Sequence, residues 1–165
     1  MDNIDRKKLK TLYKASEIAE VWEAEQHTPL IEHPEIGWIS PNHYRSMYKG
    51  KPCPYCGKKM VQGKDLYSTS SKKEAIARGY EYRDENGHPV INEANKTFFH
   101  PNYLTLDHKI NKARCPEKMF DHDNLEAICW RCNRKKADNN AFEIQYIEEY
   151  VESLSREAID RYPLL

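Results

Sequence analysis

The sequence has no long apolar segment. No stretch approaches the roughly 18 consecutive apolar residues of a membrane-spanning helix, and no apolar run follows the charged residues at the N-terminus. The mean hydropathy of -0.93 is typical of a globular protein with a wet surface. At 165 residues the chain is long enough for one domain with its own core. We therefore expect a protein without membrane segments that stays in the cytoplasm.

The chain also lacks net charge. It has 26 basic and 26 acidic side chains, which argues against a protein that coats nucleic acid through bulk positive charge. The charges are nevertheless segregated, because the stretch 49–73 contains seven lysines and one aspartate while the stretch 143–160 is acidic. A second basic cluster contains Arg131, Arg134, Lys135 and Lys136. This pattern predicts a local phosphate-binding face, with ordinary solvated lysines as the alternative for either run.

Disulfide bonds are not expected, because no export signal is present and the cytosol keeps thiols reduced. Four of the five cysteines form two C-x-x-C pairs, Cys53 with Cys56 and Cys129 with Cys132. This spacing lets two thiolates from one tight turn reach the same tetrahedral ion. Two such pairs in one short chain predict a structural zinc site, with redox pairs as the alternative. Cys115 is left over, and we interpret it as an ordinary residue.

Local patterns predict helices towards both ends. Apolar residues recur at helical intervals within 5–26, and several prolines and two glycines in 27–52 indicate an irregular connector. A last helix, capped by Asn140, has one apolar face that we expect to pack on the domain. That face contains Ile144, Ile147, Val151 and Leu154.

The long gap between the two cysteine pairs predicts an ordered insertion at about residues 61–100. Ser71 and Glu74 have the spacing of a capping box, so a short helix should begin there and stop at Gly79. Asn86-Gly87 is a turn signal between two short apolar stretches.

The segment from residue 103 to residue 136 is the most informative. Residues 103–107 and 125–128 have the pattern of strands, and residues 131–137 that of a helix. Asp107, His108 and Asn133 should therefore converge where strand and helix face each other.

This segment resembles the HNH endonuclease family. It has the family's acidic residue followed by histidine, Asp107-His108, then Asn124-Leu125, and then a C-x-x-C followed by Asn133 and basic residues. Asn133 stands where many members have histidine, so the resemblance is to the His-Asn-Asn subtype. It implies a ββα unit around one catalytic metal ion.

The resemblance and the side-chain chemistry together imply separate roles. His108 is the general base that takes a proton from water, and we expect its imidazole to face the substrate. Asp107 and Asn133 hold Mg²⁺ or Mn²⁺, because an amide oxygen is a harder donor than imidazole. Asn124 does not touch the metal but ties down the loop that aims His108. Candidates for phosphate binding are Lys109, Arg131, Arg134 and Lys136, with solvent-facing side chains as the alternative.

These patterns together predict an α+β fold. Its centre is a small ββα-metal HNH core stapled by a four-cysteine zinc site, with flanking helices at both ends and the insertion between the cysteine pairs. We divide the chain into an N-terminal helical arm and connector at 1–48, a nuclease domain at 49–140, and a C-terminal helix at 141–165.

The predicted function is divalent-metal-dependent hydrolysis of DNA phosphodiester bonds. DNA is the expected partner, and the neutral overall charge adds a protein partner for targeting. The alternative is a zinc-ribbon module that binds nucleic acid without catalysis, which explains the cysteines and the basic residues but not Asp107, His108, Asn124 and Asn133 together. No residue selects the biological setting among phage packaging, restriction, mobile elements and antiphage defence.

Overall fold

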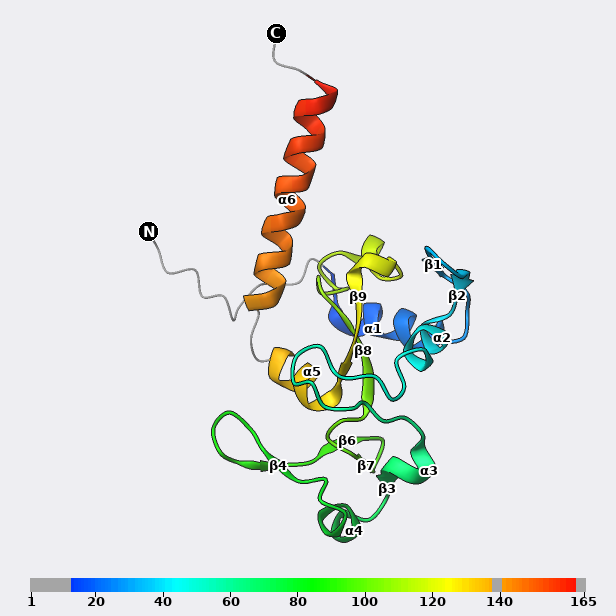
Figure 1. Cartoon of the computed structure of the whole chain (residues 1–165), viewed down its shortest axis with the longest axis vertical. Helices are drawn as coiled ribbons and strands as arrows, with labels where there is room; N and C mark the ends of the chain where they lie inside the picture. The colour runs from blue at the N-terminus through cyan, green and yellow to red at the C-terminus, as the bar shows by residue number, and fades with distance from the viewer. Residues whose placement is uncertain (1–12, 138–140, 163–165) are drawn as a thin grey trace.

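The structure is a computed structural model that describes residues 13–137 and 141–162. Figure 1 shows a body of short strands and helices, from which one long C-terminal helix projects. Within the described parts of the chain, no helix combines the length and the apolar composition needed to cross a bilayer.

An antiparallel hairpin lies at the centre of the fold. It consists of β8 (Leu104–His108) and β9 (Leu125–Cys129), and its register places Asp107 opposite Glu126. Helix α5 (Trp130–Ala137) follows β9 directly and contacts both strands. The predicted strands and helix of the α+β core are therefore confirmed, with element ends shifted by a residue or two.

The two sides of β8 face different parts of the protein. Burial alternates along the strand, because successive side chains point to opposite sides. Leu106 and His108 face Trp22 and the first hydrophobic core, whereas Thr105 and Asp107 face α5. This alternation separates the two residues of the Asp107-His108 motif.

The N-terminal arm packs on the hairpin and shares its core. The arm consists of α1 (Ala15–Ala24), β1 (Ile31–His33), β2 (Gly37–Ile39) and α2 (Pro41–Ser46). The core that it shares with the hairpin and its loop contains Trp22, Ile31, Ile39, Tyr44, Leu106, Met119 and Leu125. This core joins residues on both sides of the boundary that we predicted at residue 48.

The prediction of an irregular connector at 27–52 was wrong. The segment forms the β1–β2 hairpin and α2, whose first helical residue is Pro41. Proline is accommodated there because the first N–H of a helix has no intrahelical partner, and Ser40 caps the helix by accepting from His43 N–H at 3.1 Å. Of the helix predicted within 5–26, α1 forms the described part, and residues 1–12 lie outside the described residues.

The first cysteine pair lies in a tight turn closed by backbone hydrogen bonds. The N–H of Cys53 donates to the carbonyl of Lys58, and the N–H of Gly57 donates to the carbonyl of Cys53, each at 2.8 Å. Gly57 has φ +70°, a conformation that glycine adopts without strain. The turn contributes to a second hydrophobic core, whose buried members are Cys53, Met60, Leu104, Ala127, Ile128 and Cys129.

The insertion between the cysteine pairs is ordered, as predicted. It contains α3 (Lys64–Tyr67), α4 (Lys72–Ala77), a sheet in the order β3-β7-β6, and a β4–β5 hairpin. The strands are β3 (Ser68–Thr69), β4 (Tyr82–Arg83), β5 (Pro89–Val90), β6 (Asn92–Ala94) and β7 (Thr97–Phe99).

Two local predictions within the insertion are confirmed. The hydroxyl of Ser71 accepts from Glu74 N–H at 3.2 Å and caps α4, which ends just before Gly79. The Asn86-Gly87 turn lies between β4 and β5. The pairing of β6 and β7 was not anticipated.

Two short 3₁₀ turns lie in the loop between β8 and β9. They are η1 (Pro116–Lys118) and η2 (His122–Asn124).

The C-terminal helix α6 (Ala141–Arg161) differs from our expectation of packing. Its side chains are described from residue 148 onwards, and over that part all of them are exposed. Val151 and Leu154, from the predicted apolar face, are 52% and 46% exposed. The Lys118 ammonium lies 4.3 Å from the ring centroid of Tyr150 and forms a cation–π pair with it. Val151 and Leu154 are therefore not buried in a core. Figure 1 shows the helix leading away from the body.

Candidate active site and metal centre

Four cysteine sulfurs meet at the end of the central hairpin. Cys53 and Cys56 come from the tight turn, Cys129 ends β9, and Cys132 lies in the first turn of α5. The four Sγ atoms all lie within 4.8 Å of one another, and those of Cys56 and Cys129 are 3.7 Å apart. The cluster is positioned to bind a metal ion.

The electrostatics of the cluster disfavour four thiolates in the absence of a cation. Burial opposes ionisation of Cys53, but backbone hydrogen bonds to its sulfur outweigh burial and lower its pKa to about 7. Burial raises the pKa of Cys129 to about 11, and burial together with the Cys129 sulfur raises the pKa of Cys132 further. Thiolates gathered this closely repel one another, so ionisation of all four requires a positive charge between them.

Asp107 and Asn133 lie on the α5 side of the hairpin. The Asn133 side chain is held by its Nδ2, which donates to the hydroxyl of Thr105 at 3.1 Å, and this hydroxyl donates to the carbonyl of Ile128 at 2.8 Å. The amide oxygen of Asn133 therefore remains an acceptor. Among the described residues, no donor to it is found.

The carboxylate of Asp107 already binds a cation. The ammonium of Lys136 forms a short ion pair with Asp107 Oδ2 and lies 3.3 Å from the carbonyl oxygen of His108. Both side chains are mostly buried, with 11% exposure for Lys136 and 20% for Asp107. The two oxygens near the ammonium, one from a carboxylate and one from a backbone carbonyl, are of the kind that hard divalent cations prefer.

His108 lies on the opposite side of the strand and is buried. The residue is 8% exposed, and the ring of Trp22 packs edge-on against the imidazole with the ring centroids 4.5 Å apart. Burial, and then the positive charge of Lys112, lower its pKa to about 4. We expected this imidazole to face the substrate, whereas the structure packs it beneath α1. The alternation of side chains along β8 is the physical reason.

The loop after β8 fixes the orientation of the imidazole. His108 Nε2 and the carbonyl oxygen of Met119 are 2.9 Å apart, and because a carbonyl only accepts, Nε2 carries the proton. Nδ1 then keeps a lone pair. No sequence motif identifies Met119 or Trp22 as partners of His108, because a backbone carbonyl belongs to no motif and Trp22 is one apolar residue of a helix face.

Asn124 holds that loop in place. Its side chain is 1% exposed, accepts from Ile110 N–H at 2.8 Å, and donates to the carbonyls of Ile110 at 3.2 Å and Lys118 at 3.1 Å. Lys118 immediately precedes Met119, whose carbonyl contacts His108. Asn124 thus acts on the loop and not on the α5 side of the hairpin.

The four predicted phosphate-binding residues lie in different surroundings. Arg134 is exposed on α5, and Arg131 is partly exposed with its guanidinium 5.4 Å from the centroid of Tyr82. Lys109 is partly buried next to the motif. Lys136 is engaged with Asp107, which differs from the expected solvent-facing or phosphate-binding position.

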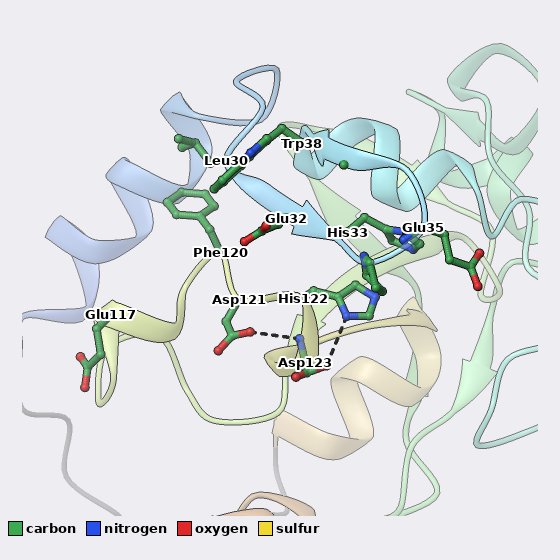
Figure 2. Close-up of a pocket in the computed structure, with 12 residues that line it drawn as sticks. Leu30, Glu32, His33, Glu35, Trp38, Glu117, Phe120, Asp121, His122 and Asp123 are labelled. Carbon is green, nitrogen blue, oxygen red and sulfur yellow. Dashed lines mark hydrogen bonds and ion pairs between the residues drawn. The ribbon is translucent and has the colours of Figure 1, made fainter.

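A pocket of about 760 Å³ lies on another part of the surface, between the β1–β2 hairpin and the loop from Glu117 to Asp123 (Figure 2). Its lining includes five carboxylates and no lysine or arginine. The carboxylates are Glu32, Glu35, Glu117, Asp121 and Asp123. Their negative charge makes this pocket unsuitable for a phosphate.

Residues 94–139 match the sequence model of the HNH endonuclease family. The match spans β6 to α5 and includes Asp107, His108, Asn124 and Asn133, whereas Cys53 and Cys56 lie outside it. This segment is similar to HNH endonuclease domains, and the similarity indicates a nuclease-type function and nucleic-acid binding. The match covers less than a third of the chain. No curated protein and no solved structure shows significant similarity to this chain.

Proposed function

We propose that the protein is a divalent-metal-dependent HNH endonuclease that hydrolyses phosphodiester bonds in DNA. The observation that carries the proposal is that the mostly buried carboxylate of Asp107 lies on the same side of the hairpin as Asn133, within the segment that matches the HNH endonuclease family. A carboxylate with this placement needs a positive partner. A loop that holds His108 through the Met119 carbonyl lies at the end of the same strand.

The cysteine cluster is proposed to hold one structural zinc ion. Zinc–sulfur bonds of about 2.3 Å in a tetrahedron place neighbouring sulfurs about 3.8 Å apart. The separation of 3.7 Å between the sulfurs of Cys56 and Cys129 fits this geometry. An all-thiolate set favours zinc over the harder divalent cations. The ion would tie the tight turn to the end of the hairpin, across the insertion.

Asp107 and Asn133 are proposed to hold Mg²⁺ or Mn²⁺. When bound there, the ion supplies positive charge that stabilises the phosphate and the leaving 3′ oxygen. Lys136 must release the Asp107 carboxylate for this, and its freed ammonium can then bind a phosphate. Arg131 and Arg134 are proposed to bind the DNA backbone on the exposed side of α5.

His108 is proposed to act as the general base. With the proton on Nε2, its Nδ1 takes a proton from a water molecule, whose oxygen forms the bond to phosphorus. The bond from phosphorus to the 3′ oxygen breaks, and that oxygen takes a proton from solvent. The products carry 5′-phosphate and 3′-hydroxyl ends. Burial keeps the imidazole neutral at pH 7, because its pKa is lowered to about 4.

A second candidate is a nucleic-acid-binding module without catalysis. Two observations favour it, namely the ion pair of Lys136 with Asp107 and the packing of Trp22 over His108. Both would have to change before Asp107 and His108 could act on a phosphate.

Cleavage assays decide between the two candidates. The purified protein is incubated with supercoiled, linear and single-stranded DNA and with RNA, across a panel of divalent metals and in EDTA. Nicks in supercoiled DNA that require Mg²⁺ or Mn²⁺ are expected. Bound DNA that stays intact in every metal would support the module without catalysis.

His108→Gln and Asp107→Ala test the assigned roles. Glutamine retains a donor for the Met119 carbonyl and most of the buried volume, whereas alanine at His108 would leave a cavity beside Trp22. Loss of the base should lower the cleavage rate by about 10²–10⁴-fold. Retention of bound zinc shows that each variant is folded, and cleavage near the wild-type rate would remove the residue from the mechanism.

A further inference from the structure

A basic hollow lies between the tight turn of the first cysteine pair and the exposed face of α5. Its volume is about 350 Å³. Its lining contains Tyr55, Cys56, Lys58, Arg131, Cys132, Lys135 and Lys136, with four cations and no carboxylate. We call it the α5 hollow. Its charge is opposite to that of the pocket in Figure 2, which has five carboxylates and no lysine or arginine.

The α5 hollow adjoins the proposed catalytic residues. Lys136 lines the hollow and also contacts the Asp107 carboxylate. A group bound in the hollow would therefore lie next to the site where the scissile phosphate is proposed to bind.

Two cations of the hollow, Lys58 and Lys135, are open to solvent. Lys58 is exposed in the tight turn, and Lys135 is 68% exposed with a distant ion pair of 3.9 Å to Glu85. Exposed pairs of this kind contribute little to stability, so Lys135 can exchange Glu85 for a phosphate. The hydroxyl of Tyr55 donates to Glu126 at 2.6 Å, which engages this neighbouring carboxylate.

Arg131 stands between the α5 hollow and a smaller one of about 200 Å³. The smaller hollow is lined by the β4–β5 hairpin and α5. It contains two carboxylates, Asp84 and Glu85, together with four cations, which are Arg83, Arg131, Arg134 and Lys135. The ring of Tyr82 from this hairpin supports the Arg131 guanidinium. The α5 hollow lacks the carboxylates of the smaller hollow, so a phosphate there meets no repulsion from a carboxylate in the lining.

We infer that the α5 hollow binds a backbone phosphate of DNA next to the scissile one, through Lys58, Arg131 and Lys135. This inference rests on the proposed nuclease function and assigns Lys58, in the cysteine turn, a part in substrate binding. The tight turn thereby serves both as half of the metal centre and as one wall of the substrate site.

The test is equilibrium binding of a DNA duplex in EDTA, measured by fluorescence anisotropy over a range of salt concentrations. Lys58→Gln and Lys135→Gln should each weaken binding about three- to tenfold at low salt. Each should also reduce the slope of log affinity against log salt by about one, as expected for one lost phosphate contact. Lys73→Gln is the matched control, because this exposed lysine in α4 lies away from the hollow and should leave the slope unchanged.

Zinc retention, measured on the same variants, distinguishes a role in binding phosphate from a role in neutralising the cysteine thiolates. If Lys58 and Lys135 serve only to neutralise the thiolates, their loss should weaken zinc retention and leave the salt slope as in the wild type. That result would overturn the inference, as would equal slopes for Lys58→Gln and Lys73→Gln. His108→Gln should bind DNA normally without cutting it. Normal binding with no cleavage by the wild type in any metal would contradict the nuclease function while leaving the α5 hollow as a phosphate site.

Discussion

Replacement of Asn124 by alanine should be strongly destabilising. The change removes three hydrogen bonds from a side chain that is 1% exposed, and it leaves the N–H of Ile110 without its partner. A hydrogen bond contributes about 1 kcal/mol net, and an unsatisfied buried polar group costs about 1–3 kcal/mol. The expected loss is about 3–5 kcal/mol. This is a large fraction of the roughly 5–15 kcal/mol that stabilises a typical domain.

The assay is urea unfolding followed by circular dichroism in excess zinc, with Asn124→Asp as the matched variant. Aspartate can still accept from Ile110 N–H, but its charged form faces the carbonyls of Ile110 and Lys118. Protonation restores a donor, so the folded state should raise the pKa of this carboxyl. The folded state then binds the extra proton, and the variant should recover stability relative to wild type as the pH falls towards 4.

A loss below about 1 kcal/mol in Asn124→Ala would refute this account of the loop. Equal pH dependence of Asn124→Asp and wild type would refute the assignment of the amide nitrogen to the two carbonyls. Because the same loop carries the Met119 carbonyl, Asn124→Ala should also weaken the hold on His108. A changed His108 titration, measured by NMR in conditions where the variant is folded, checks that step.

Three further predictions concern the cysteines, His108 and Lys136. Cys56→Ser should bind less than half an equivalent of zinc and unfold at lower urea than wild type, and elemental analysis showing a full equivalent would contradict the proposed zinc site. Burial lowers the pKa of His108 to about 4, whereas the unfolded chain titrates near 6.5, so the unfolded chain binds more protons between these values. This group should therefore lower the free energy of unfolding by about 3 kcal/mol as the pH decreases from 6.5 to 4. Unfolding titrations of His108→Gln should lack this pH dependence. The same pH dependence in the variant and the wild type would show that the ring is not buried in solution. Lys136→Met should bind Mn²⁺ more tightly than the wild type or the control Lys135→Met in calorimetry, because no ammonium competes for Asp107. Equal or weaker Mn²⁺ affinity in Lys136→Met would show that the ion pair does not block the metal site.

The sequence by itself determined the parts of the molecule that depend on near neighbours. Three features depend on contacts within a few residues and can therefore be predicted from a short stretch of sequence. They are the C-x-x-C turns, the Ser71 cap of α4 and the turn at Asn86-Gly87. The Asp107-His108 motif and the ββα unit were predictable for the same reason, since alternation and helical periodicity are local properties.

The tertiary structure alone decided which partners these residues have. The Lys136 ammonium contacts Asp107, which is 29 residues away in the sequence, and the ring of Trp22, in the N-terminal arm, contacts His108. No local pattern encodes such pairs, because they form only when separate elements bury their apolar faces against one hairpin. The N-terminal arm showed helical and turn signals, but its place over His108 depends on how the side chains of α1, the β1–β2 hairpin and β8 fill one core.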